Sequence, residues 1–344
     1  MSNISIGALH IHSKYSDGTS AIKEIALAAK KTGLSWIIIT DHNNIEGLKN
    51  GEEGWYNGVA VLIGEEISPE NSDHYLALNI KQEISEKMPP ESFIQEVKKQ
   101  GGIGFIAHPD ENLARKNNLK PLRWRDWDIQ GFDGIEIWNY LSDWVDNFDS
   151  KKAFWNYFLR QRMLNGPTLS TLEWWDRLNN SSAKIIPAIG GVDAHALEYK
   201  FLGIKFKVFP YYESFKTVTN CLYLDNELSK SFEQAKIQII NALRDGKNTI
   251  INKIWNNKEN FDFFIENKEK QAFPGNSIKL DKQTKAVINL SKKAKIKLIH
   301  NSKLIQEYTG KELIFKDLIP GKYRVEVFYK NHPWIFTNPI QIII

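Results

Sequence analysis

The sequence predicts an α/β fold of the barrel type over residues 1–250 and a smaller, all-β domain over residues 251–344. Three observations predict it. Short apolar runs alternate with amphipathic stretches in the first part of the chain, a pattern typical of α/β proteins. Polar residues, many of them His, Asp or Glu, directly follow these runs, and in an α/β barrel such positions form the rim that carries the chemistry. After about residue 250 the chain becomes rich in Lys and Asn, and short strand patterns replace the alternation.

The first predicted unit is a strand over residues 6–11, followed by a polar loop and a helix over residues 21–31. Apolar residues at positions 22, 25, 26 and 29 have helical spacing. Ser20 is the expected N-cap, Glu24 lies in the first turns, and Gly33 is expected to close the helix.

The same alternation continues to about residue 190. One further helix is predicted over residues 91–100. Residues 36–40 are continuously apolar and β-branched up to Thr40, as expected of a strand buried on both faces. The predicted strands after the first unit are residues 36–40, 59–63, 75–80, 104–107, 134–137 and 185–189.

The second part of the chain is predicted to be a β-sandwich. Its strand patterns include residues 286–290, 296–299 and 323–329, and Pro-Gly turn signals lie at 274–275 and 320–321. It contains two of the eight histidines but no cluster of them, so no chemistry is expected there.

Composition narrows the class of protein. The net charge of +4 comes without a long Lys/Arg block, so no stable nucleic-acid partner is expected. No run of about 18 apolar residues is present, so no membrane-spanning helix is expected. Cys221 is the single cysteine, and residues 1–20 lack the apolar core of a signal peptide. A reducing, cytoplasmic location is therefore expected.

The candidate chemistry begins at His10 and His12. In a β-strand, residues i and i+2 point to the same face, so both imidazoles could bind one metal ion. Histidine and carboxylate ligands suit zinc, manganese or iron better than calcium. The nine candidates exceed the needs of one ion and suffice for two or three, which could activate water. These metal-ligand candidates are His10, His12, Asp17, His42, Glu66, His74, His108, Asp193 and His195.

These positions resemble the polymerase and histidinol phosphatase (PHP) family. Five motifs between residues 9 and 195 carry the resemblance: Leu9-His10-Ile11-His12-Ser13 with Ser16-Asp17-Gly18, Ile39-Thr40-Asp41-His42-Asn43, Gly64-Glu65-Glu66-Ile67-Ser68 with Asp73-His74, Ala107-His108-Pro109, and Gly191-Val192-Asp193-Ala194-His195. The tail, residues 320–327 and 333–340, is similar to the C-terminal part of the CehA/McbA-like metallohydrolases.

The resemblance implies a distorted seven-stranded (β/α)7 barrel of the TIM type with two or three divalent metal ions. Carried over by motif, one ion would be bound by His10, His12, Glu66 and Asp193. Glu66, with Glu65 as the fallback, would bridge to a second ion bound by His74 and His108. A third ion would be bound by Asp17, His42 and His195. Some family members have His where this chain has Asp17, a change that favours manganese or iron over zinc at the third site. The expected catalytic residues are Asp17, Asp193 and His195.

Other residues near the motifs are candidates for supporting roles. Lys14, Arg123 and Arg125 could bind a phosphate, or could be ordinary surface charges. Glu136 and Asn139 follow a predicted strand and could orient the ligands or line the rim.

The leading functional hypothesis is a metal-dependent phosphoesterase that acts on a small phosphorylated molecule or nucleotide through a hydroxide activated at a two- or three-metal site. A carbamate or carboxylic ester hydrolase with the same metal site is the alternative, supported by the tail. A binding protein with an inert barrel is disfavoured, because no motif ligand is missing. A proofreading nuclease of a polymerase is also disfavoured, since the chain has no basic stripe.

Overall fold

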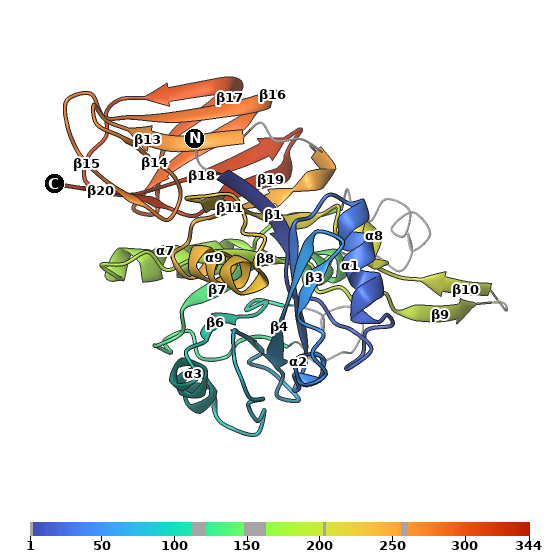
Figure 1. Ribbon diagram of the computed structural model, residues 1–344. Coiled ribbons are helices and arrows are strands. Elements are labelled where there is room, and N and C mark those ends of the chain that lie inside the picture. The colour runs from blue at the N-terminus through green and yellow to red at the C-terminus, as the bar shows by residue number, and fades with distance from the viewer. Residues whose placement is uncertain (1–2, 112–121, 148–162, 202–203, 256–260) are drawn as a thin grey trace.

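The first part of the chain forms one sheet whose strand order follows the chain. The computed structural model describes residues 3–111, 122–147, 163–201, 204–255 and 261–344 (Figure 1). Neighbouring strands are parallel except that β5 is antiparallel to both of its neighbours. In order of pairing the strands are β1 (Asn3–Ala8), β2 (Trp36–His42), β4 (Val59–Ile67), β5 (Tyr75–Leu78), β6 (Ile103–Ile106), β7 (Gly134–Asn139) and β8 (Ala188–Gly191).

Further strands extend this sheet beyond β1. β11 (Val218–Leu224) pairs antiparallel with β1, and β12 (Asn248–Asn252) pairs antiparallel with β11. β3 (Gly54–Tyr56) forms a hairpin with β4. β9 (Glu198–Phe201) and β10 (Ile204–Lys207) form a separate hairpin that projects from the molecule (Figure 1).

Helices connect and cover the strands. The first helix, α1, buries the predicted apolar positions. Its predicted N-cap was wrong: Ala21 occupies the cap, and the Glu24 carboxylate accepts a hydrogen bond from the backbone N–H of Ala21 at 3.3 Å. No described helix is long and apolar enough to cross a bilayer. The helices are α1 (Ile22–Lys31), α2 (Glu46–Lys49), α3 (Pro90–Lys99), α5 (Tyr140–Asp146), α7 (Leu169–Ser181), α8 (Tyr211–Ser214) and α9 (Phe232–Arg244), with a 3-10 turn at Lys253–Trp255.

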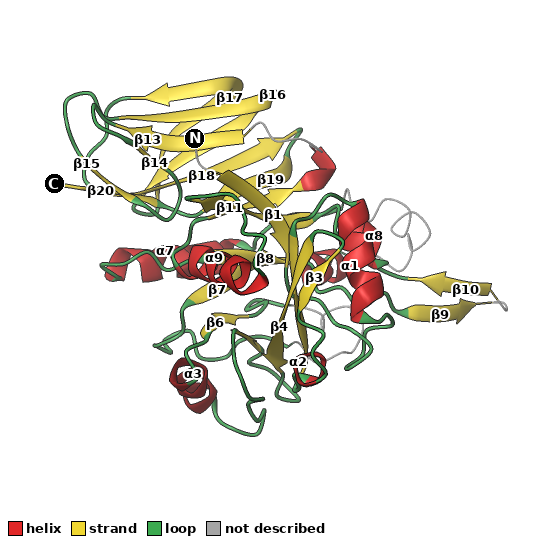
Figure 2. Ribbon diagram, viewed as in Figure 1, coloured by secondary structure: helices red, strands yellow, loops and turns green. Residues whose placement is uncertain are grey.

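The second part of the chain is almost entirely strands, as Figure 2 shows. It has its own apolar core, which includes Phe263, Ile288 and Trp334. The predicted strands 286–290 and 296–299 are one strand, β16, with a register shift between Asn289 and Ala294. The strands are β13 (Phe261–Glu266), β14 (Gln271–Ala272), β15 (Ser277–Lys279), β16 (Lys285–His300), β17 (Lys303–Phe315), β18 (Gly321–Tyr329), β19 (His332–Thr337) and β20 (Ile340–Ile343).

The two parts are joined by hydrogen bonds as well as by the chain. β19 pairs antiparallel with β12, so the sheet is continuous across residue 250. The Lys322 ammonium donates to the carbonyls of Asn179, Ser182 and Lys184 at 2.7, 2.8 and 2.6 Å, near the C-terminal end of α7. Burial lowers the pKa of Lys322 to about 8. The predicted division at residue 250 stays a prediction.

The α/β class is confirmed, but the sheet does not close through a regular ladder. Three asparagine side chains take the place of a neighbouring strand at β8. Asn220 bonds the N–H and C=O of Gly190 at 3.0 and 2.6 Å. Asn248 donates to the carbonyl of Ala188 at 3.0 Å, and Asn338 bonds both the N–H and C=O of Ala188 at 2.7 and 2.9 Å. A closed barrel of seven strands stays a prediction.

These amide contacts predict the effect of Asn338→Ala. The substitution leaves buried backbone groups of Ala188 without one of their partners, and each such loss costs about 1–3 kcal/mol. We expect the free energy of unfolding to fall by about 2–4 kcal/mol, measured by urea unfolding followed by circular dichroism. The control is Asn226→Ala on an exposed loop, which should change that free energy by less than about 0.5 kcal/mol. Equal stability of the two variants would contradict the role given to Asn338.

Candidate metal centre

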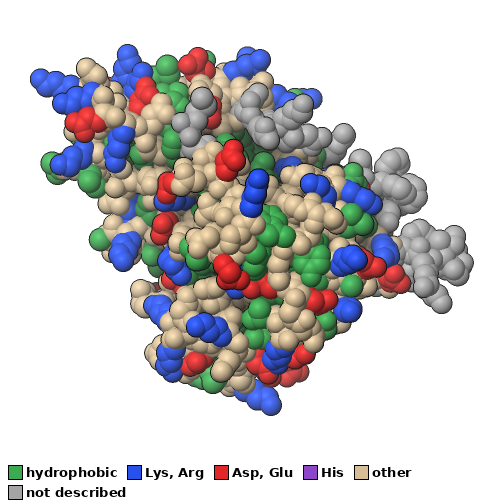
Figure 3. Space-filling model, viewed as in Figure 1, with side chains coloured by type: hydrophobic (Ala, Val, Ile, Leu, Met, Phe, Trp, Pro, Cys, Tyr) green, Lys and Arg blue, Asp and Glu red, His purple; other side chains and the backbone are tan. Residues whose placement is uncertain are grey.

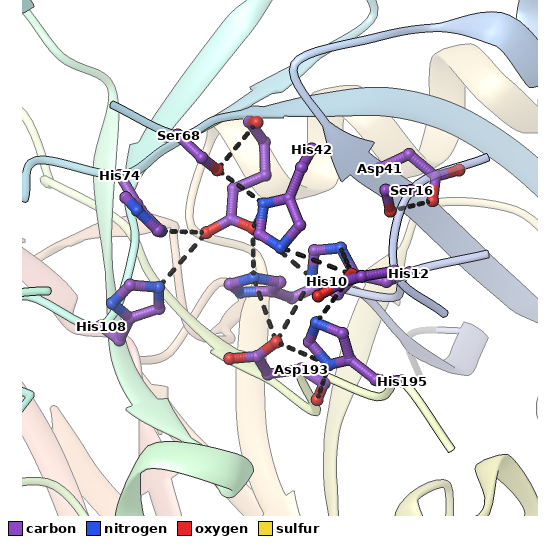
Figure 4. Close-up of polar contacts among 12 residues, drawn as sticks. His10, His12, Ser16, Asp41, His42, Ser68, His74, His108, Asp193 and His195 are labelled. Atoms are coloured by element: carbon purple, nitrogen blue, oxygen red, sulfur yellow. Dashed lines mark hydrogen bonds and ion pairs between the residues drawn. The ribbon is translucent and has the colours of Figure 1, made fainter. Parts of the chain in front are cut away.

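The candidate ligands lie at or just beyond the ends of the strands, where they converge (Figure 4). His42 ends β2, Glu66 lies near the end of β4, and His108 follows β6. The segments after β1 and β8 meet through an isolated bridge between Ile11 and Ala194, with a hydrogen bond of 3.0 Å from the N–H of His12 to the carbonyl of Ala194. This bridge brings the two histidines after β1 beside the ligands after β8.

His10 and His12 converge for a reason other than strand pleating. β1 ends at Ala8, and His10 has a left-handed φ of 62°. The two imidazole rings still lie 5.3 Å apart between centroids. His108 and Asp193 also have positive φ values of 27° and 48°. Because such conformations are unfavourable for residues with a Cβ, they mark a site whose surroundings impose the geometry.

The Glu66 carboxylate lies at the centre of the cluster. Its Oε1 is 2.9 Å from His74 Nδ1 and 3.2 Å from His108 Nε2. Its Oε2 is 2.9 Å from His42 Nδ1, 3.3 Å from His10 Nε2 and 3.4 Å from His12 Nε2. The two oxygens therefore face different groups of imidazoles, as a bridging carboxylate requires.

Asp193 and Asp17 complete the cluster on the other side. Asp193 Oδ1 lies 3.3 Å from His12 Nε2 and 3.4 Å from His195 Nδ1. Asp17 Oδ1 lies 3.2 Å from His195 Nε2 and 3.6 Å from His42 Nε2. The Asp17 side chain is 55% exposed, whereas that of Asp193 is 10% exposed. Asp17 therefore stands at the solvent side of the site.

The donor set fits divalent metal ions. His10 Nε2, both ring nitrogens of His12 and Glu66 Oε2 are buried without a hydrogen-bond partner. Unpartnered buried polar atoms are costly, and coordination to a cation would satisfy them. In each of four groups, all the ligand atoms lie within 4.8 Å of one another: His12, Asp17, His42 and His195; His10, His12 and Glu66; His10, His108 and Asp193; and Glu66, His74 and His108.

Burial and neighbouring charges shift the pKa values strongly. Burial alone would raise the pKa of Glu66 and Asp193, but the surrounding histidines lower both well below their usual values. Burial lowers the pKa of His42 and His108, yet the facing carboxylates outweigh it and raise both to about 9. Burial, together with the neighbouring His195 and His42, lowers the pKa of His12 to about 3. Imidazolium charge thus balances the carboxylates in the metal-free protein.

A second layer of side chains orients the ligands. Glu136 Oε1 lies 2.8 Å from His10 Nδ1, and Asn139 donates to Glu136 and Asp193 at 3.1 and 3.2 Å. The sequence pointed to both of these residues. It missed Glu111, whose Oε2 lies 3.2 Å from His108 Nδ1. The signal for Glu111 was a carboxylate three residues after a histidine at a strand end.

The predicted phosphate-binding cations have contacts of their own. Lys14 is exposed, and its ammonium lies 5.2 Å from the Tyr15 ring centroid. Arg123 Nε donates to the carbonyl of Glu111 at 3.0 Å. Arg125, 70% exposed, forms an ion pair with Asp73, its Nε donating to Oδ2 at 2.7 Å. A role for the three cations in binding substrate stays a prediction.

Seven of the nine candidate ligands, all except His10 and His12, line a cavity of about 240 Å³. Leu122, Leu141, Val145 and Leu197 form an apolar part of its wall. A small molecule could therefore reach the cluster while part of the surrounding water is excluded.

Two adjacent glutamates of β4 allow a matched test of the ligand set. Glu66 faces the histidines, while Glu65, on the opposite face of the strand, accepts a hydrogen bond from the N–H of Ile84 at 2.9 Å, and burial raises its pKa to about 8. We expect Glu66→Gln to lower bound metal by roughly tenfold or more and Glu65→Gln to keep it, measured by elemental analysis after manganese loading. Metal loss in the Glu65 variant alone would make Glu65 the ligand.

Metal binding should release protons. His42 and His108, with pKa values of about 9, are protonated at neutral pH in the metal-free protein, and ligation requires their neutral form. Their raised pKa values stabilise the metal-free fold below pH 6.5, and this contribution is lost as pH rises through about 9. Affinity for manganese should therefore rise from pH 6.5 to 9.

Isothermal titration calorimetry in buffers with different ionisation enthalpies measures this release directly. We expect at least three protons, from His10, His42 and His108, to leave per protein on saturation with manganese at pH 7.5. A binding enthalpy that is the same in every buffer, with an affinity that does not change with pH, would contradict the protonation states assigned to His42 and His108.

Comparison with known proteins places these features in a family. A model of the PHP domain matches residues 8–115. An uncharacterized protein from Methanocaldococcus jannaschii is 33% identical over 154 residues, which cover 40% of this chain and 85% of that protein.

Two solved structures are similar at lower levels. One is a two-domain protein from Bacteroides vulgatus containing a predicted PHP-like metal-dependent phosphoesterase, with 15% identity, a TM-score of 0.49, and coverage of 98% of this chain and 95% of that chain. The other is a candidate metal-dependent phosphoesterase from Bifidobacterium adolescentis, with 16% identity, a TM-score of 0.34, and coverage of 55% and 87%. The assignment depends on the sequence matches, and the likeness of the tail to CehA/McbA-like enzymes stays a prediction. The chain belongs to the PHP domain family.

Proposed function

We propose that this protein is a metal-dependent phosphoesterase that hydrolyses a small phosphorylated molecule or nucleotide. The observation that carries the proposal is the convergence of histidines, all but His42 buried, on the two oxygens of Glu66 at a cavity open to small molecules. Zinc, manganese or iron bound there would lower the pKa of water and neutralise charge on the phosphoryl oxygens.

The proposed ligand sets follow three of the four groups of converging side chains. Glu66, His74 and His108 form one group, which supports the set carried over by motif. Asp17, His42 and His195 form another, which includes His12 in addition. His10, His12 and Glu66 form a third, with Asp193 beside both histidines. These sets support the proposal of two or three ions, with Glu66 shared between two of the sets.

The side chains at the rim are proposed to move the proton that the leaving alcohol requires. His195 Nε2 faces Asp17 Oδ1 at 3.2 Å, and Asp17 reaches solvent. Burial alone would lower the pKa of His195, but Asp17 and Asp193 raise it; the pKa of Asp17 is lowered, because His195 outweighs its burial. When the group formed by Asp17, His42 and His195 holds no ion, the proton of the pair is held on the imidazole, from which it can pass to the departing oxygen, while Asp193 holds the ring from its other side.

The proposal also includes a domain boundary, a barrel and a cellular location. We place the boundary of the PHP domain near residue 250, treat strands β1, β2 and β4 to β8 as a distorted seven-stranded barrel, and expect a cytoplasmic protein. On the face seen in Figure 3, described Lys and Arg side chains are interspersed with Asp and Glu. On this face the pattern is not the basic stripe that would follow a nucleic-acid duplex.

Hydrolysis of matched chromogenic substrates tests the proposal. Manganese-loaded protein is given p-nitrophenyl phosphate, bis(p-nitrophenyl) phosphate and 1-naphthyl N-methylcarbamate. We expect phosphoester turnover, and a fall of about a hundredfold or more in His12→Ala and Asp193→Ala, because both residues contact the central cluster. Asn226→Ala is the control and should retain activity. Turnover of the carbamate alone would show that the bond assignment is wrong.

A further inference from the structure

The strand β17 forms a free edge of the β-rich part. It has 13 residues and pairs along one side with β16. β16 in turn pairs on its other side with β13 and β18. Among the strands that the structure describes, β16 is the one partner of β17, and Figure 1 shows β17 at the outer border of the β-rich part. Backbone N–H and C=O groups along its second side are therefore available to another strand.

This edge strand carries exposed apolar side chains. Leu304, Tyr308 and Ile314 are 53, 45 and 46% exposed, and Ile305 is 36% exposed. β18, on the other side of β16, is mostly buried. A long edge strand with exposed apolar side chains favours pairing with another strand, and native proteins usually protect such edges with charges. The positions of the charges on β17 therefore decide which strands can approach it.

Two charged residues flank the midpoint of β17 symmetrically. Glu307 lies two residues before Thr309, and Lys311 lies two residues after it. In an antiparallel pair of two β17 strands in which Thr309 faces Thr309, each Glu307 faces Lys311 of the other copy. This contact occurs twice because of the twofold symmetry. The charges that would repel most strands thus attract a second copy of this one.

The same register also matches the apolar residues on both sides of the midpoint. The apolar residues that face each other are Leu304 with Ile314 and Ile305 with Leu313. A shift by one residue is excluded, because residues opposite each other in an antiparallel pair must point the same way. A shift by two residues would bring Lys311 opposite Ile305 in one direction, or Glu307 opposite Leu313 in the other. The register centred on Thr309 is therefore the favoured one.

The local structure of β17 is compatible with this pairing. Its own irregularity against β16 lies at Ile305, so residues 306–312 around the midpoint are free of it. Glu307 Oε1 lies 3.6 Å from Lys295 Nζ on β16, whereas Lys311 forms no ion pair within the part of the chain that the structure describes. A second copy would supply Lys311 with a carboxylate. The Gln306 amide donates to the carbonyl of Glu307 at 3.1 Å, an exposed contact that the N–H of an incoming strand could replace.

We propose that this protein forms a twofold symmetric dimer in which the β17 strands of two copies pair antiparallel about Thr309. The sheet then continues from one copy into the other, and the exposed apolar side chains of each edge lie against those of the second copy. The interface contains no residue of the metal cluster. The dimer therefore goes beyond the proposed function and does not depend on it.

Complementary charge variants test the dimer and its register. The dissociation constant is measured by sedimentation velocity over a series of protein concentrations. We expect the native protein to dimerise, and Lys311→Glu and Glu307→Lys each to weaken the dimer by about tenfold or more, because each places two like-charge pairs across the axis. An equimolar mixture of the two variants should form a heterodimer with a constant within about threefold of the native one, since every such pair is again of opposite charge.

The contrary results are equally clear. A native protein that stays monomeric at every concentration would overturn the dimer. A native dimer that neither variant weakens would show that the copies meet through another surface. Weakening in both variants without recovery in the mixture would overturn the register. Circular dichroism and bound manganese, measured for each variant, should match the native protein, because both residues are exposed and far from the metal ligands in the sequence.

Cysteine cross-linking gives a second, independent readout. In the proposed register the Cβ atoms of two Thr309 residues lie about 4.5–5.5 Å apart, so Thr309→Cys should form a disulfide-linked dimer on oxidation with diamide. The control is Lys303→Cys on the same exposed strand. Its two copies would lie about 40 Å apart, twelve residues along the strand, and should not link. The native Cys221 is buried and should give no linked dimer.

Non-reducing gel electrophoresis measures the linked fraction. A linked dimer of the Thr309 variant but not of the Lys303 variant would support the antiparallel register. Linking of the Lys303 variant to the same extent, or no linking of the Thr309 variant, would overturn it.

Discussion

Burial of negative charge is the constraint on which this structure depends. Glu66 and Asp193 lie almost out of reach of water, where an uncompensated carboxylate would cost several kcal/mol. The fold meets this cost by ending its strands together, so that imidazoles from separate segments surround the two carboxylates (Figure 4). The two buried carboxylates therefore need positive charge nearby, from protons or from divalent ions. The protein needs this charge to fold as well as to carry out its chemistry.

The backbone at the cluster is adapted to this purpose at some cost. His10, His108 and Asp193 have positive φ values, and each such residue costs about 1–3 kcal/mol. The side chain of a ligand can then turn toward the centre at the point where its strand has ended. Orienting partners such as Glu136 fix the rings from behind, so the geometry is established before any ligand arrives.

The order of predicted strands and the positions of the candidate ligands could be taken from the sequence, because both depend on local pattern: an apolar run and the polar residue that ends it. The conformation of His10 could not be taken from the sequence, because it is imposed by the bridge between Ile11 and Ala194, two residues that lie far apart along the chain. Long-range contacts likewise explain why the edge of β8 could not be predicted, whereas Glu111 lies only three residues after His108 and had a local signal in the sequence. The local pattern predicts two separate strands, residues 286–290 and 296–299. It does not reveal that they form one strand with a register shift.

The amide of Asn338 bonds Ala188, which is 150 residues earlier in the chain, and Ala188 begins the strand that leads to Asp193 and His195. On a ribosome, which adds residues from the N-terminus onward, the ligand motifs up to residue 195 therefore emerge well before the side chain that completes the support of β8. During this interval the growing chain displays histidines and carboxylates whose arrangement is unfinished. The last of the side chains that support β8 is therefore added to the chain only after the second part of the protein has been synthesised.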